Sequence, residues 1–210
     1  MYDLDEQQQL EIIKAWLVRH GKGVVFGIFA VLIGITSFLG YRHYALRQAE
    51  KASTLYDGLL KMGKGEDIKK VRLAASSIVE TYPGTPYAGR AALIVAQRDF
   101  EAGDMNDARL QLQWVLDHSK ESGIRDIARL RLARVFFDEK QYGDAIGTLD
   151  GQHSEAFDGL YSDLKGDIFA EQGKRDQARS AYLVALNKIQ NGSAYRNVVS
   201  IKLDAAGGAK

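Results

Sequence analysis

The chain has 210 residues, of which 46% are hydrophobic and 26% charged, with 28 basic and 27 acidic side chains. This near-neutral balance argues against a nucleic-acid-binding protein, which needs a basic surface. The sequence contains no cysteine, which excludes a disulfide framework, thiol catalysis and a cysteine-based metal site. It contains only two prolines, so long uninterrupted helices are expected.

An uncharged run, GVVFGIFAVLIGITSFLGY, occupies residues 23–41. As a helix it would be about 28 Å long, close to the roughly 30 Å of a bilayer's hydrocarbon core. We therefore expect a transmembrane helix over residues 23–44, embedded in the lipid bilayer. A cleaved signal peptide is disfavoured because the preceding segment is long and acidic and no small-residue cleavage site follows. Basic residues are balanced at the two ends of the run, so the positive-inside rule leaves the orientation undecided.

Residues 1–22 precede the expected span and contain apolar residues at helical spacing between positions 5 and 20. This pattern fits an amphipathic helix at the membrane interface, and it fits a solvated extension of the span equally well.

Small residues recur along one face of the expected span. They are Gly23, Gly27, Ala30, Gly34 and Ser37, spaced by four, three, four and three positions. Residues seven apart on a helix are displaced by only about 20°, so these side chains form one stripe. Such a stripe lets another helix approach closely, but glycine is common in membrane helices in any case. A partner-binding stripe and ordinary membrane composition both remain open.

From residue 45 onward, turn signals separate segments that have the patterns of helices. The expected helices cover residues 45–62, 66–81, 86–102, 105–119, 123–140, 143–150, 155–172, 175–190 and 194–204. Three of them carry an alanine with a small residue twelve positions earlier: Ala108 with Ala96, Ala145 with Ala133, and Ala178 with Gly166. A period near 34, with small residues where paired helices cross, resembles the tetratricopeptide repeat.

The expected fold is therefore all-α, with a transmembrane helix followed by a tetratricopeptide-like α-solenoid over residues 45–204. The last segment, 194–204, is expected to cap the open end of the solenoid. Its apolar residues are Val198, Val199, Ile201 and Leu203. The small and polar end, 205–210, is expected to be a disordered tail.

The sequence lacks patterns of catalysis or metal binding. No phosphate loop or nucleophile elbow occurs, and the four histidines are not at metal-ligand spacing. Asp163 and Asp167 are four positions apart, but the nearby Lys165 favours a solvated helix face over paired catalytic carboxylates. The arginines at 129, 131 and 134 have acidic neighbours, which favours surface ion pairs. We expect a non-enzymatic protein without cofactor.

The first helices of tetratricopeptide repeats line a groove. By repeat position, the expected groove residues are Arg90, Leu93, Gln97, Phe100, Leu130, Arg134, Phe137, Asp163 and Asp167. Mixed leucine, phenylalanine and arginine side chains suit extended or partly folded apolar segments. Packing within the solenoid explains the same side chains equally well.

Several segments resemble YfgM-type proteins, the ancillary subunits of the bacterial SecYEG translocon. They are DEQQQLEIIKAWLVRHGK at 5–22, LRLARVFFDEKQYGDAIGTLD at 130–150, SDLKGDIFAEQGKRDQARSAYLVALNK at 162–188 and IKLDAA at 201–206. The two long central segments are the most specific, and residues 45–85 match loosely. The resemblance covers nearly the whole chain.

The resemblance implies a single-pass inner-membrane protein of a Gram-negative bacterium, with a cytoplasmic N-terminus and a periplasmic repeat domain. Its implied partners are the SecYEG translocon, a PpiD-type membrane-anchored chaperone and unfolded or nascent secretory polypeptides. The implied function is that of a chaperone-like adaptor that helps to pass secreted polypeptides to periplasmic chaperones. A membrane-tethered scaffold or regulator of an envelope complex or stress response is the alternative.

Overall fold

The computed structural model describes residues 3–63 and 65–208, and all regular elements in these ranges are helical. They are α1 (Asp3–Leu60), α2 (Ile68–Thr81), α3 (Pro86–Ala102), α4 (Met105–His118), α5 (Ser122–Asp138), α6 (Tyr142–Leu149), the 3-10 turn η1 (Glu155–Phe157), α7 (Asp158–Glu171), α8 (Arg175–Lys188) and α9 (Ala194–Ala205). The expected all-α fold is thereby confirmed, and most helices end within three residues of their predicted bounds.

Helix α1 is longer than the sequence suggested, because residues 45–60 continue it instead of forming a separate helix. No proline or other strong breaker separates the uncharged run from these residues. By its contacts the chain divides into two compact units, one up to Gln48 and one from Ala49 to Lys210. Residues 49–60 of α1 therefore belong to the second unit.

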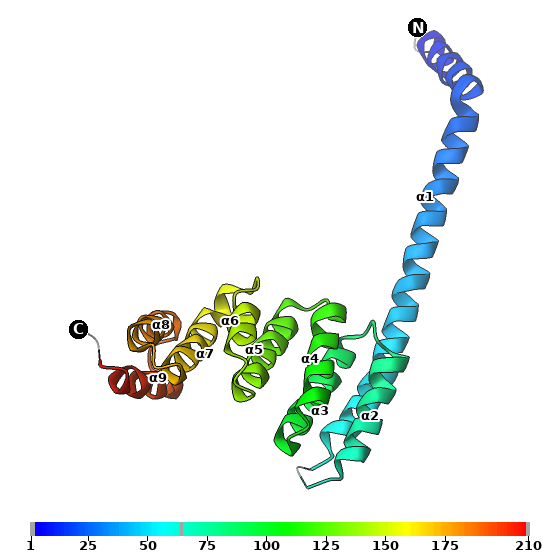
Figure 1. Cartoon of the computed structure of the whole chain (residues 1–210). Coiled ribbons are helices and arrows are strands. Elements are labelled where there is room, and N and C mark those ends of the chain that lie inside the picture. The colour runs from blue at the N-terminus through cyan, green and yellow to red at the C-terminus, as the bar shows by residue number, and fades with distance from the viewer. Residues whose placement is uncertain (1–2, 64, 209–210) are drawn as a thin grey trace. The chain divides into compact units, whose positions relative to one another are not determined.

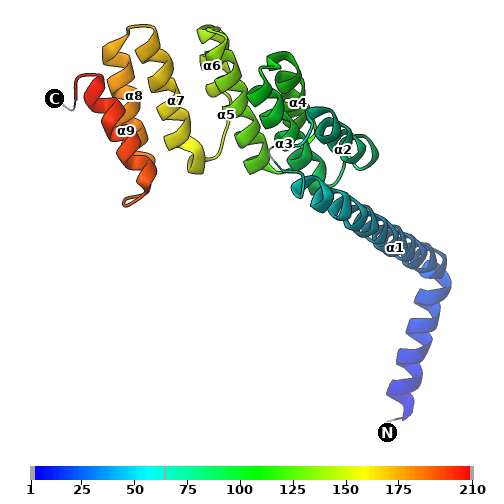
Figure 2. The ribbon, with the colours of Figure 1, turned by 90° about the horizontal axis from the view of Figure 1, so that it is seen from below.

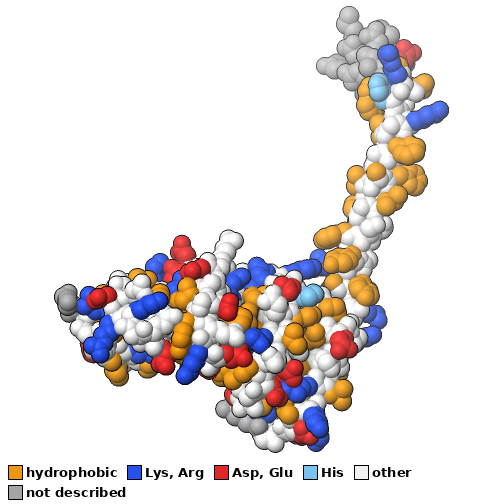
Figure 3. All heavy atoms as spheres, viewed as in Figure 1, with side chains coloured by type: hydrophobic (Ala, Val, Ile, Leu, Met, Phe, Trp, Pro, Cys, Tyr) orange, Lys and Arg blue, Asp and Glu red, His pale blue; other side chains and the backbone are white. Residues whose placement is uncertain are grey.

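The first unit contains the candidate membrane span. Helix α1 is long and apolar enough from Lys14 onward to cross a membrane, and its large apolar side chains are exposed. Figure 3 shows hydrophobic side chains along the visible side of this helix. Since α1 is the one such helix among the described residues, the structure fits a single-pass membrane protein. The side chains of residues 1–10, 12 and 13 lie outside the described part, so the amphipathic pattern remains a prediction.

The second unit is a series of helix pairs (Figures 1 and 2). Helix α3 packs on α4, α5 on α6, and α7 on α8, and each second helix also contacts the first helix of the next pair. At the N-terminal end, residues of α1 from Ala52 to Leu59 share a core with α2 and α3. This alternation of pairs is the arrangement of a tetratricopeptide-like solenoid.

The small residues lie where paired helices cross, as predicted. The alanines at 96, 108, 133, 145 and 178 are all buried. At Gly166 even one added Cβ would lie 2.4 Å from a ring carbon of Tyr182. Small side chains are needed at these positions because the helix backbones approach closely.

Helix α9 packs on α8 through only part of its expected apolar face. Val199 and Leu203 are buried, but Val198 is 46% exposed and Ile201 is 69% exposed. The prediction that Val198 and Ile201 form part of the cap was therefore wrong. Residues 199 and 203 are four positions apart and share one helix face, whereas 198 and 201 lie on another.

The expected disordered tail begins too early, because Ala205 is the last residue of α9. Residues 209 and 210 lie outside the described part of the chain.

Candidate peptide-binding groove

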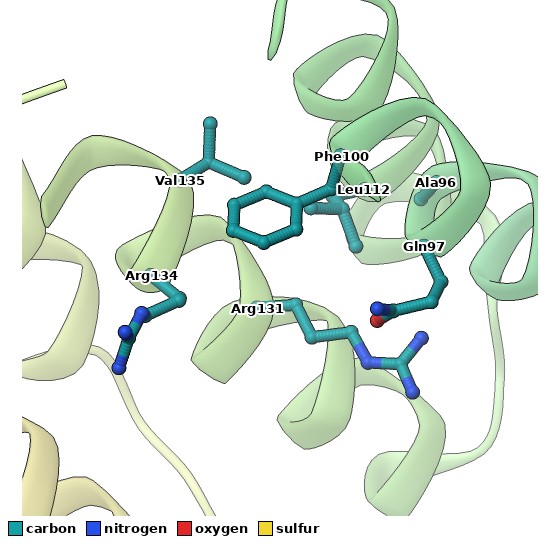
Figure 4. Close-up of a pocket in the computed structure, with 7 residues that line it drawn as sticks. All are labelled: Ala96, Gln97, Phe100, Leu112, Arg131, Arg134 and Val135. Carbon is teal, nitrogen blue, oxygen red and sulfur yellow. The ribbon is translucent and has the colours of Figure 1, made fainter. Parts of the chain in front are cut away.

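A small pocket opens between α3, α4 and α5 and contains part of the predicted groove (Figure 4). Its lining residues are Ala96, Gln97, Phe100, Leu112, Arg131, Arg134 and Val135. Three of these, Gln97, Phe100 and Arg134, were expected from repeat position. The structure therefore brings the expected groove residues of two successive repeats together at one site.

The floor of the pocket is apolar. Ala96, Leu112 and Val135 are almost completely buried, and Phe100 packs on the same core cluster while staying partly exposed. Helices α3, α4 and α5 each contribute to this floor, so it depends on the stacking of neighbouring repeats. An apolar side chain placed here would leave water and contact these groups, which is favourable.

Arg131 forms the polar side of the pocket. It is only partly exposed, and its Nη1 donates a hydrogen bond to the carbonyl oxygen of Leu93 at 2.9 Å. Burial lowers the pKa of its guanidinium. Figure 4 shows this guanidinium turned toward the side-chain amide of Gln97.

Arg134 lies at the edge of the pocket, and its guanidinium points away from it in Figure 4. Its Nε is 3.2 Å from an Asp138 carboxylate oxygen, and its guanidinium lies over the Phe137 ring at 5.2 Å from the centroid. An Asp167 oxygen lies 4.0 Å from its Nη1. The charge of Arg134 is thus already balanced by neighbouring groups.

Four other predicted groove residues do not line the pocket and make contacts within the repeat unit. Arg90 makes two hydrogen bonds of 2.7 Å to the Glu121 carboxylate. Leu93 is buried in the core beneath the pocket. Leu130 and Phe137 pack against the core shared by α5, α6 and α7. For these residues the packing interpretation fits the structure better than an open groove.

Asp163 and Asp167 do not form the solvated helix face that the sequence favoured. Asp163 is 3% exposed, and Lys202 Nζ lies 2.8 Å from its Oδ2 and 2.9 Å from an Asp167 oxygen. The hydroxyls of Tyr182 and Tyr195 donate to Asp167 and Asp163, respectively. The prediction was wrong because α9, distant in sequence, brings Lys202 and Tyr195 onto these carboxylates.

The surroundings of the two tyrosines in this cluster change their pKa values. Burial, reinforced by the neighbouring carboxylates, raises the pKa of Tyr182 and of Tyr195 well above the ordinary value. Both hydroxyls therefore stay protonated and remain hydrogen-bond donors at neutral pH. The hydrogen bonds and ion pairs of this cluster connect α9 and α8 to α7.

The predicted ion pairing of the arginine cluster on α5 is only partly right. Arg129 Nη1 lies 3.3 Å from Asp126, and Arg134 pairs with Asp138. Arg131 has no carboxylate within ion-pair distance among the side chains that the structure describes. Its side chain is directed toward α3 and not toward the acidic residues on its own helix.

Four of the seven lining residues were not predicted from the sequence as groove residues: Ala96, Leu112, Arg131 and Val135. Ala96 was predicted as a packing residue, and Arg131 as a surface residue. Arg131 could have been predicted as a groove residue because it is next to Leu130 on the first helix of a repeat. The wall of a groove is wider than one row of side chains spaced three and four positions apart, so it includes such neighbours.

In the described part of the chain, no group of three or more His, Cys, Asp or Glu side chains could hold a metal ion. Along the candidate span, a Cβ added at Gly23, Gly27 or Gly34 meets no described atom within 4 Å beyond the neighbouring backbone of α1 itself. The small-residue stripe is therefore sterically open, and its binding of a partner remains a prediction.

Comparisons with known proteins bear on this fold and site. A family model described as a tetratricopeptide repeat-like domain matches residues 14–208. A Neisseria gonorrhoeae protein named ancillary SecYEG translocon subunit is 28% identical over 203 residues, covering 96% of this chain and 97% of that protein. Proteins of the same name from Haemophilus influenzae and Escherichia coli are 29% and 28% identical, and cover 86% and 85% of this chain and 88% and 85% of their own lengths. No solved structure is significantly similar to the chain.

The chain belongs to the tetratricopeptide repeat-like family, since the family model matches most of its length. Within that class, the similar proteins confirm the resemblance to YfgM-type proteins that the sequence indicated.

Proposed function

We propose that this protein is a non-catalytic accessory subunit of the SecYEG translocon and that its repeat domain holds segments of secreted polypeptides. The name shared by the three similar proteins supports the association with the translocon. The pocket between α3, α4 and α5 supports the binding of secreted polypeptides, because its apolar floor is open to a side chain from another polypeptide. Translocating chains are unfolded and expose such side chains.

The proposed arrangement in the membrane follows the expected domains. Residues 1–22 are cytoplasmic, residues 23–44 span the inner membrane, and residues 45–204 lie in the periplasm. The resemblance to YfgM-type proteins supports this orientation, and the length and exposure of the apolar part of α1 support the span. In this arrangement the groove is on the side of the membrane where secreted chains emerge.

The proposed role is to receive emerging chains and pass them to periplasmic chaperones, together with a PpiD-type membrane-anchored chaperone. The small-residue stripe from Gly23 to Ser37 is proposed as the contact to a partner's transmembrane helix. Its open surface lets a second helix backbone come close, which is how helices associate within lipid.

Site-specific photocrosslinking during secretion tests the role of the groove. The full-length protein carries a photoreactive amino acid at Gln97, on the pocket wall, or at Ser180, an exposed position on α8. We expect a secretory precursor to crosslink to position 97 much more than to position 180. Equal crosslinking at the two positions contradicts a specific groove. Crosslinks to envelope proteins without any precursor favour the scaffold or regulator.

Protease accessibility tests the orientation. Protease added to spheroplasts should degrade the repeat domain and leave a fragment containing the span. Protection of the repeat domain in intact spheroplasts contradicts a periplasmic location.

A further inference from the structure

The pocket contains a positive charge that no carboxylate balances within the described residues. Arg131 contacts one protein acceptor there, the carbonyl oxygen of Leu93 at 2.9 Å. A guanidinium has five N–H donors, so most of those of Arg131 remain available. The nearest comparable side chain in the pocket, Arg134, is instead paired with Asp138.

Two other arginines of the second unit show what a purely structural contact to a carbonyl looks like. Arg125 donates to the carbonyl of Ser119 at 2.7 Å, and Arg196 donates to those of Leu186 and Ile189. These carbonyls lie at the C-terminal ends of α4 and α8, where the helix supplies no further N–H groups.

The carbonyl of Leu93 is different, because it lies inside α3, where the helix's own N–H groups already serve as donors. Arg131 is therefore not needed to cap a helix. Its partial burial also disfavours its charge and lowers its pKa, and a carboxylate beside it would offset that cost.

The apolar floor and the guanidinium of Arg131 together indicate which chemical groups a ligand of this pocket must have. The floor formed by Phe100, Leu112 and Val135 suits an aliphatic side chain, and an arginine fork matches a carboxylate with two parallel hydrogen bonds. In an extended polypeptide, side chains two positions apart lie on the same face. One chain segment can thus present an apolar side chain and a carboxylate to the same wall.

We infer that this pocket selects extended polypeptide segments in which an apolar side chain lies two positions from an aspartate or glutamate. The apolar side chain enters the pocket between α3, α4 and α5, and the carboxylate pairs with Arg131. This inference rests on the proposed function, since it specifies which segments the groove holds.

Peptide binding to the full-length protein in mild detergent tests the inference. The probes are fluorescein-labelled ten-residue peptides with one leucine that has aspartate, asparagine or lysine both two positions before it and two positions after it. Fluorescence anisotropy should show the aspartate peptide binding about tenfold more tightly than the asparagine peptide, because a hydrogen bond to a charged group is stronger than a neutral one. The lysine peptide should bind weakest.

Variants locate the preference. Arg131→Met keeps the apolar stem and should bind the aspartate and asparagine peptides equally, whereas Arg131→Lys should retain part of the preference. Arg125→Met removes an arginine from the same helix but outside this pocket, and should keep the full preference. Phe100→Ala should weaken both peptides alike. Circular dichroism melting identifies variants that do not fold, and if Arg131→Met is among them, Arg131→Lys and Phe100→Ala decide.

The two hypotheses fail in different ways. If the wild-type protein binds the three peptides equally, the charge preference is wrong but a peptide-binding groove stands. If the preference persists in Arg131→Met, it arises elsewhere and the assignment to this pocket is wrong. If no peptide binds, the proposed polypeptide-binding role fails together with the inference.

Discussion

At Gly166 the contact between α7 and α8 leaves no room for a side chain. A Cβ at this position would lie 2.4 Å and 2.5 Å from two ring carbons of Tyr182. The ring is buried, and its hydroxyl is held by Asp167 at 2.9 Å, so it has little freedom to move away. A sequence pattern of small residues thus corresponds to a specific steric requirement.

We expect Gly166→Ala to destabilise the repeat unit by about 1–3 kcal/mol, the typical cost of overpacking a core. Gly147→Ala is the matched control, because Gly147 also lies inside a helix but a Cβ there meets nothing within 4 Å. That variant should be neutral or stabilised, by up to about 1 kcal/mol, since alanine favours helix more than glycine. Urea unfolding measures both, and equal effects would contradict the close crossing at Gly166.

The tyrosines that contact Asp163 and Asp167 predict an alkaline limit to stability. Their raised pKa values mean that the folded state holds these protons more tightly than the unfolded state, where the pKa is about 10. Their contribution to stability is therefore complete below about pH 10 and is lost as the pH rises above it.

Urea midpoints measured between pH 8 and pH 12 check this limit. The wild-type midpoint should fall above about pH 10. In the double variant Tyr182→Phe, Tyr195→Phe the midpoint should be lower at neutral pH and fall less steeply. Parallel curves for the two proteins would show that these hydroxyls do not govern the alkaline limit.

At the scale of single elements, the apolar composition of α9 predicted that it packs on the solenoid, but its orientation decides which of its apolar side chains are buried. Its apolar residues indicated a capping helix, and Val199 and Leu203 do pack on the last repeat. Lys202 adds an ion pair to Asp163, so α9 is held by polar contacts as well as by apolar burial. Val198 and Ile201 remain exposed.

Replacing apolar side chains of α9 by alanine should reduce stability more on its buried face than on its exposed face. Leu203→Ala removes a buried side chain and should cost about 2–3 kcal/mol, at the lower end for such cavities because α9 is a terminal helix. Ile201→Ala should change the stability by less than about 0.5 kcal/mol. Thermal melting followed by circular dichroism distinguishes them, and a large effect of Ile201→Ala would mean that the orientation of α9 is different.

The span of α1 permits a separate test of helix association. Gly27→Leu and Gly34→Leu keep the span apolar, and a Cβ at either position has no described neighbour within 4 Å beyond its own stretch of helix, so membrane insertion should survive. Both add bulk where a partner backbone is expected, and close packing is what drives association in lipid. We therefore expect these variants to lose copurification with translocon or PpiD-type partners in mild detergent.

Ile28→Leu and Leu32→Met lie off the small-residue stripe and serve as controls that retain the partners. If the glycine variants copurify as well as the controls do, the stripe is ordinary membrane glycine. Partner binding would then have to reside in the repeat unit or in residues 1–22.

At the scale of the whole molecule, the chain consists of two units with different environments. In the first unit the large apolar side chains that the structure describes, from Trp16 onward, are exposed, whereas the unit from Ala49 onward buries its own in four clusters. Ala52 and Leu59, at the end of α1, belong to the second unit's core. The repeat unit thus requires the last turns of α1 but none of the uncharged run.

Residues 45–210 expressed alone should accordingly be soluble and predominantly helical. A further truncation that removes residues 45–60 should lower the melting temperature by several degrees, because the burial of Leu59 is lost and each fully buried side chain of this kind contributes about 1.5–3 kcal/mol. Circular dichroism and size-exclusion chromatography check both statements. An aggregated or unfolded 45–210 fragment would show that the units are not independent.

The sequence by itself determined most local features of this protein: the apolar run, the bounds of the helices after α1 to within about three residues, and the alanines and Gly166 at the crossings. These depend on residues close together in the chain, on turn chemistry and on a repeated spacing, all of which are visible without coordinates. The groove was only partly predictable, since repeat position identified Gln97, Phe100 and Arg134 but assigned Arg131 to the surface.

The tertiary structure alone decided which charges are paired and which apolar faces are buried. Asp99 occupies the place of Phe136 and Phe169 in the next two repeats, and it is buried with Arg72 Nε at 2.7 Å, 27 positions away. The pairing of Lys202 with Asp163 spans 39 positions, and the Arg131 contact to Leu93 spans 38. The energy of a charge depends on its distance to the opposite charge and on its burial, and both arise only when helices distant in sequence pack together.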